Sequence, residues 1–140
     1  AAFIPLLIGT GGNVGAQSST VIIRGLSTQR LQSLGSWRAI WREAVAGALL
    51  GFLLMLVVIP WAADVSGGNW LVAWAAGISL VGITTLAATA GAALPLLFNR
   101  LGLDPALMSA PFIATATDVA GVFIYLRTAM ILLERFSSAS

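Results

Sequence analysis

The sequence has no cysteine, no histidine and no lysine, and only 9% of its 140 residues are charged. Without cysteine there are no disulfides and no thiol chemistry, and without cysteine and histidine the usual ligand sets of zinc and haem are excluded. No nucleophile and base pair can be drawn from what remains, so we do not expect an enzyme. All seven cations are arginines, and we interpret the net charge of +2 as a signal of membrane topology and not as a nucleic-acid surface.

Long hydrophobic runs make up most of the chain. Hydrophobic residues account for 59% of it, and the mean hydropathy is +0.97. This composition is typical of a membrane protein and not of a soluble domain. We predict an all-α, polytopic transmembrane helical bundle that forms one domain over residues 1–140. Four runs are long enough to cross a hydrocarbon core of roughly 30 Å, and we place the spans at about 3–24, 44–63, 70–98 and 105–134.

The distribution of arginine predicts the orientation in the membrane. An even number of spans places both termini on one side. The loop 25–42 is rich in arginine and the turn 99–104 holds Arg100, whereas the turn 64–69 has no arginine. By the positive-inside rule the first two are cytoplasmic, and both termini lie outside. Tryptophans are expected at both interfaces, with Trp61, Trp70 and Trp74 outside and Trp37 and Trp41 inside.

Local signals predict where the helices begin and end. Ser36 is expected to cap a short interfacial helix that precedes the second span. Pro60 and Asp64 are expected to end that span. Asp104 is expected to cap the fourth span, with Pro105 at its first helical position. The start of the chain lacks a basic stretch and an initiator methionine, which favours a fragment or a trimmed chain over a signal peptide.

A polar stripe interrupts the first span. Side chains three or four residues apart share one face of a helix, and here they are Thr10, Asn13, Gln17, Thr20 and Arg24. Amides and hydroxyls are costly in contact with lipid, so this face is expected to meet water or another helix.

Glycines in the same stretch have two interpretations. They would leave backbone carbonyls accessible to a passing ion, and they are Gly9, Gly11, Gly12 and Gly15. The alternative is close helix packing through Gly11 and Gly15. Two other pairs of small residues four apart are expected to serve packing alone, namely Gly47 with Gly51 and Ala87 with Gly91.

Asp118 is the one acidic residue deep inside a predicted span. An ionised carboxylate at that depth is costly unless it meets water or a cation, although a structural hydrogen bond is the alternative. Its helix face is expected to hold Pro111, Thr115, Val122 and Tyr125, with Ala114 one turn before it. Proline cannot donate to the carbonyl four residues back, so a carbonyl is freed. Carboxylate, hydroxyl and carbonyl oxygens suit a hard cation such as Mg²⁺, and a two-fold axis would bring two carboxylates together.

Two stretches carry a resemblance to a known family. The run from Pro5 to Arg24, with Gly9-Thr-Gly-Gly-Asn13 at its centre, and the run from Asp104 to Tyr125, with Thr115-Ala-Thr-Asp118, resemble the signature stretches of the MgtE magnesium channels. The resemblance extends from Ala1 to about Arg135.

The resemblance implies a homodimer whose pore, on the dimer axis, is lined by the first and fourth spans. It implies that Asp118, Ala114 and Asn13 hold the Mg²⁺ ion, which is both bound and transported, and that Gly9, Gly12, Gln17, Thr115 and Pro111 line the pore. It also implies a multi-pass protein of the inner (plasma) membrane, with lipid as a partner. Family membrane domains have five spans and are joined to cytoplasmic regulatory domains, so the first span and those domains are absent from this chain.

The expected function is therefore a passive, voltage-driven magnesium channel that selects hydrated Mg²⁺ through paired Asp118 carboxylates. Two alternatives remain open. One is a proton-coupled secondary cation transporter, for which no charged partner of the acid is visible within the membrane. The other is a non-conducting assembly module.

Overall fold

The computed structural model describes residues 3–28 and 35–137, and within these ranges the chain is helical, with no strand. The helices are α1 (Ile4–Ser27), α3 (Ser36–Val65), α4 (Trp70–Arg100) and α5 (Pro105–Ser137). The predicted all-α bundle is confirmed, and each predicted span lies inside one of these helices except at Phe3, where α1 begins one residue later.

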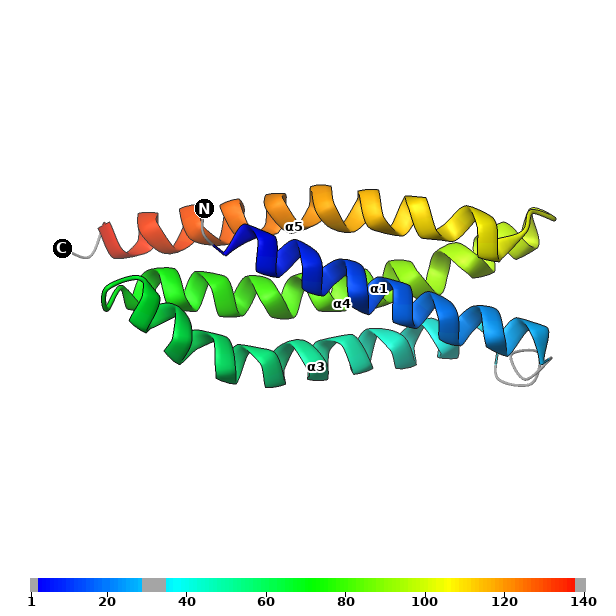
Figure 1. The fold of residues 1–140 in the computed structure, drawn as a ribbon, viewed down its shortest axis with the longest axis horizontal. Coiled ribbons are helices and arrows are strands. Elements are labelled where there is room, and N and C mark those ends of the chain that lie inside the picture. Colours follow the sequence, from blue (N-terminus) through cyan, green and yellow to red (C-terminus); the bar gives the residue numbers. More distant parts are fainter. Residues whose placement is uncertain (1–2, 29–34, 138–140) are drawn as a thin grey trace.

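Helix α4 is the centre of the bundle. The other three helices pack against it, α1 also packs against α5, and α1 and α3 scarcely touch. Figure 1 shows α3, α4 and α5 running back and forth with short turns between them, while α1 crosses α4 obliquely. In the most apolar part of α4, 56% of the residues are buried, against 22% in α3 and 25% in α5. The outer helices therefore turn large apolar surfaces away from the bundle.

Small residues let the helices approach closely. A Cβ atom on Gly47 would lie 2.6 Å from the carbonyl oxygen of Thr84, and one on Gly51 would lie 2.7 Å from Cα of Val81. The predicted packing role of this glycine pair, against α4, is confirmed. Gly91 of α4 meets the backbone of α1 in the same way, since a Cβ atom there would collide with the carbonyl oxygen of Gly15.

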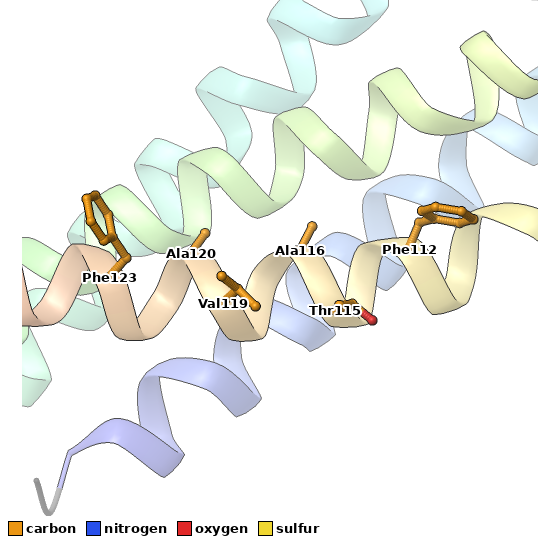
Figure 2. A pocket seen from close by; sticks show the side chains of 6 residues that line it. All are labelled: Phe112, Thr115, Ala116, Val119, Ala120 and Phe123. Carbon is orange, nitrogen blue, oxygen red and sulfur yellow. The ribbon is translucent and has the colours of Figure 1, made fainter.

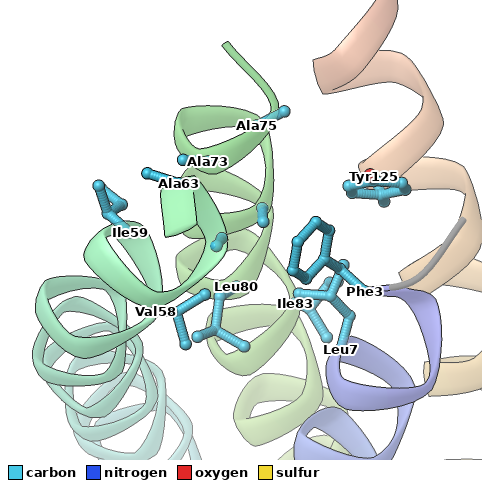
Figure 3. Packing of buried hydrophobic residues seen from close by; sticks show 12 residues of the cluster. Phe3, Leu7, Val58, Ile59, Ala63, Ala73, Ala75, Leu80, Ile83 and Tyr125 are labelled. Atoms are coloured by element: carbon cyan, nitrogen blue, oxygen red, sulfur yellow. The ribbon is translucent and has the colours of Figure 1, made fainter. Parts of the chain in front are cut away.

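An apolar core closes the end of the bundle where α1 begins. Figure 3 shows Phe3, just before α1, and Leu7 of α1 beside Ile83 of α4, with Tyr125 of α5 near Phe3. Leu80 of α4 belongs to the same buried cluster. Phe3 also makes an edge-to-face contact with Trp61, with ring centroids 5.6 Å apart. This core fixes the start of α1 against all three neighbours.

Three of the four helices are long and apolar enough to cross a membrane, counting only residues that the structure describes: α3, α4 and α5 up to Glu134. Helix α1 does not reach the same hydropathy, because amides, hydroxyls and glycines occupy its middle. Its predicted span remains a proposal.

Two predicted boundaries are wrong. No separate interfacial helix begins at Ser36, because α3 runs unbroken from Ser36 to Val65, and its N-cap is Gly35. The arginines at its start are exposed, while Ala39 on the opposite side is buried, so the helix continues through them. Pro60 does not end the helix either, because buried Ala62 and Ala63 hold the following turn in the core.

Side-chain caps and glycines with positive φ form the turns between the helices. Asp104 caps α5 as predicted, since its carboxylate oxygen accepts a hydrogen bond of 2.8 Å from the amide of Ala106. Asn69 caps α4 by accepting from the amide of Val72 at 3.2 Å. Gly67 and Gly68, between α3 and α4, have φ values of 69° and 85°, which glycine adopts without strain.

Candidate ion-binding faces of helices α1 and α5

Helix α1 has one packed face and one open face. Its packed face is apolar or small and includes Leu7, Gly11, Val14, Gly15 and Ile22. The predicted polar stripe lies on the open face: Asn13, Gln17, Thr20 and Arg24 are exposed, and Thr10 is half-buried. The sequence therefore placed these five side chains on one face correctly. In a single chain, the described bundle covers Thr10 in part and leaves the other four exposed.

The four glycines of α1 divide between the two faces. Gly11 and Gly15 are buried, and a Cβ atom on either would lie within 3 Å of an isoleucine side chain, Ile83 or Ile113. Packing is therefore confirmed for this pair. Gly9 and Gly12 have no atom within 4 Å of an added Cβ. Their backbone borders the open face, beside Asn13.

Helix α5 presents a second open face. Pro111, Ala114, Thr115 and Asp118 are all exposed, and one turn further Val122 is half-buried. Tyr125 was predicted to share this face, and that prediction is wrong. Only 6% of its surface is exposed, and its ring lies in the core beside Phe3. The opposite face of α5, with Ile113 and Thr117, packs into the bundle.

Hydroxyl groups on both open faces are fixed by their own helices. Thr115 donates a hydrogen bond of 3.0 Å to the carbonyl oxygen of Pro111, and Thr20 donates one of 2.9 Å to that of Ala16. Because each hydroxyl hydrogen is used within the helix, the oxygen is left to accept from outside. Both faces thus offer acceptors, which suit the water shell of a cation.

A buried hydrogen bond joins the two helices. The hydroxyl oxygens of Ser19 and Ser109 lie 3.1 Å apart, and Ser109 also donates to the carbonyl oxygen of Pro105. Ser19 is therefore the donor of the pair. The two residues are 90 positions apart in the chain, and no local pattern in the sequence could have paired them.

Asp118 has no protein partner among the described residues, where neither a salt bridge nor a side-chain hydrogen bond is found for it. The same part of the chain holds no group of three or more acidic side chains that could bind a metal ion. One chain therefore offers one carboxylate on an open, acceptor-rich face.

An apolar groove of about 450 Å³ lies next to this face on α5. Figure 2 shows two phenyl rings, Phe112 and Phe123, at its ends and small side chains, Ala116 and Ala120, between them. Thr115 marks the border between the groove and the polar face. The groove has almost no polar surface, so the candidate ion-binding atoms are those of the polar face.

Comparison with known proteins supports the resemblance of the two stretches. Residues 4–128 match the MgtE family model, described as a divalent cation transporter. The chain belongs to the MgtE family. A magnesium transporter MgtE of Thermus thermophilus is 45% identical over 138 residues, which cover 96% of this chain and 29% of that protein. The MgtE proteins of Enterococcus faecalis and Bacillus subtilis, also named magnesium transporters, are 35% and 33% identical over 97% and 89% of this chain.

The chain spans about three tenths of the length of these MgtE relatives, with 29%, 30% and 28% of their sequences covered. The family match and three helices that are long and apolar enough to span a bilayer together identify the chain as part of a membrane transporter family. The matched region, residues 4–128, contains the whole of α1 and the part of α5 that holds Asp118, so it includes both open faces.

Proposed function

We propose that this chain forms the ion-conducting part of a passive, voltage-driven magnesium channel of the inner (plasma) membrane. The observation that carries the proposal is the exposure of Asp118 on α5, a helix that otherwise turns apolar surface outward, and of Asn13 and Gln17 on α1, which packs beside it. In a bilayer such a face is costly against lipid, so it must be covered by water, by protein or by both.

A second copy of the chain is the simplest cover for these faces. A two-fold axis beside α1 and α5 would place two Asp118 carboxylates and two sets of acceptors around one path. Two carboxylates with retained water are a common way for proteins to hold Mg²⁺. Since one chain supplies a single carboxylate, we propose a homodimer as the functional unit.

Each residue of the proposed path has a role that follows from its chemistry. Asp118 supplies charge, and Asn13 with the backbone near Ala114 accepts hydrogen bonds from the water shell of the ion. Gly9 and Gly12 leave room for that shell, because they have open space where a side chain would be. The path is also lined by Gln17, Thr115 and Pro111, which lie toward the arginine-rich end of the bundle from Asp118.

The driving force is the membrane potential. A cation moving inward gains about 2.3 kcal/mol per charge for each 100 mV, so a divalent ion needs no coupled fuel. A monovalent ion gains half as much from the potential and less from the paired carboxylates. The remaining length of the full protein is proposed to carry the cytoplasmic regulatory domains.

The test is magnesium influx into liposomes that contain the full-length protein. Asp118→Asn is expected to lower influx at least tenfold and to weaken the preference for Mg²⁺ over K⁺, because the charge of both carboxylates is lost. Asp64→Asn, the same change at an exposed position outside the two faces, is expected to conduct like the parent.

Influx in Asp118→Asn equal to that of the parent would refute the role of the carboxylate. Influx that followed a pH gradient and ignored the membrane potential would favour a proton-coupled transporter instead. If the parent itself carried no ion under any gradient, the chain would be an assembly module and the proposal would be wrong.

A further inference from the structure

A second groove lies between the start of α3 and the end of α4, away from the proposed ion path. It encloses about 300 Å³ and is lined by apolar side chains, among them Trp37, Ile40 and Leu97, together with Ser36 and Arg100. The two helices are antiparallel, so Ser36 and Arg100 share the end of the bundle while Ile40 lies deeper. The groove therefore has a polar mouth and an apolar wall.

The groove has one charged lining residue, Arg100, at an end of the bundle where arginines outnumber acids. Four described arginines lie at this end of the bundle, against two acids, and they are Arg24, Arg38, Arg42 and Arg100 with Glu43 and Asp104. Among the residues that the structure describes, Arg100 forms no salt bridge. The unpaired guanidinium at the mouth is complementary to an anion, and guanidinium binds phosphate through two parallel hydrogen bonds.

Trp37 places the mouth at the level of lipid headgroups. Its ring lines the groove, yet 75% of its surface is exposed. Tryptophan at the end of a membrane helix favours the interface between water and hydrocarbon, where its ring meets acyl chains and its N–H meets polar groups. The groove thus opens where a phospholipid has its phosphate and extends along the helices where the lipid has its chains.

We infer that this groove binds one anionic phospholipid from the leaflet at the arginine-rich end. The phosphate lies against Arg100 and the hydroxyl of Ser36, and one acyl chain follows Ile40 and Leu97 along the wall. The site is separate from the two polar faces, so it does not rest on the proposed function. Loss of lipid binding and loss of ion conduction can be measured independently.

Native mass spectrometry of the full-length protein, released from mixed micelles of phosphatidylglycerol and phosphatidylcholine, tests the inference. The parent is expected to retain phosphatidylglycerol in preference. Arg100→Gln is expected to weaken this preference about fivefold, the effect of one basic residue at an anionic surface. Arg24→Gln, the same change at the same end but on α1, is expected to retain the preference.

Equal retention of the two lipids by the parent, or an unchanged preference in Arg100→Gln, would overturn the inference. If Arg100→Gln does not fold, the parent alone still decides the question with a phosphatidylglycerol that carries a photoreactive group on its acyl chain. Cross-links are expected near Ile40 and Leu97. Cross-links concentrated at Leu49 and Leu53, on the exposed face of α3, would place the lipid elsewhere. Displacement of the lipid by inorganic phosphate would show a free-anion site and would also overturn it.

Discussion

Gly91→Ala should separate α1 from α4 and destabilise the bundle. A Cβ atom at Gly91 would collide with the carbonyl oxygen of Gly15 and would lie 3.1 Å from its Cα atom. Carbon atoms in contact prefer about 3.5–4.0 Å, so the helices must move apart by roughly 0.5–1 Å. Both neighbours are backbone, and no side chain can rotate away.

The net cost can be worked out from two opposing terms. Overpacking of a close contact costs about 1–3 kcal/mol, and alanine in a helix recovers about 0.5–1 kcal/mol relative to glycine. We therefore expect the free energy of unfolding to fall by about 0.5–2 kcal/mol, a roughly 2- to 30-fold change in the folding equilibrium. Because α1 carries Asn13 and Gln17, magnesium influx should fall as well.

The assay is unfolding in detergent micelles titrated with sodium dodecyl sulfate, followed by tryptophan fluorescence and circular dichroism. Gly82→Ala is the matched control on the same helix, since its Cβ atom would meet only Ile124, at an ordinary 3.4 Å. The control should match or exceed the parent in stability. A stability of Gly91→Ala equal to that of the parent would refute the reasoning, because the close approach of the two backbones would then not limit the packing.

Two further predictions concern the helices that carry the open faces. Ser19→Ala and Ser109→Ala should each lower the free energy of unfolding by about 0.5–1.5 kcal/mol. Because the two side chains share one hydrogen bond, a double-mutant cycle in the same titration should find their effects strongly non-additive. Additive effects would contradict the pairing. Gly12→Ala should raise helix stability by up to about 1 kcal/mol and yet lower magnesium influx in liposomes, because its methyl group enters the open face; unchanged influx would remove Gly12 from the proposed path.

The sequence predicted the helices well because hydrophobic runs, caps and spacing are local properties. Asp104 capped α5 as expected, and the five polar side chains of α1 fell on one face. Hydropathy misled at the start of α3, where Arg38 and Arg42 interrupt the apolar run without interrupting the helix. A helix can carry charged side chains on an exposed face while its other face is buried. The start of the hydrophobic run therefore does not mark the start of α3.

The division of the glycines could not be predicted, because it depends on where α4 crosses α1. Spacing alone allowed Gly9, Gly11, Gly12 and Gly15 to serve either use, and only the packed structure separates the buried pair from the open pair. Tyr125 was placed on the face of Asp118 for a similar reason. Helical spacing gives angles around one axis, whereas a neighbouring helix that crosses at an angle covers different faces at its two ends.

The central claim is that the open faces of α1 and α5 border a water-filled ion path and do not face lipid. The described chain has no cysteine, so a cysteine placed at Asn13 or at Thr115 can be labelled selectively if the rest of the full-length protein carries none. Leu53→Cys, on the apolar exposed face of α3, is the lipid-facing control. The measurement is the rate of modification by a membrane-impermeant thiol reagent in proteoliposomes. Modification is expected to be rapid at positions 13 and 115, slowed by Mg²⁺, and almost absent at position 53. Equally slow modification at all three positions would contradict a water-filled path.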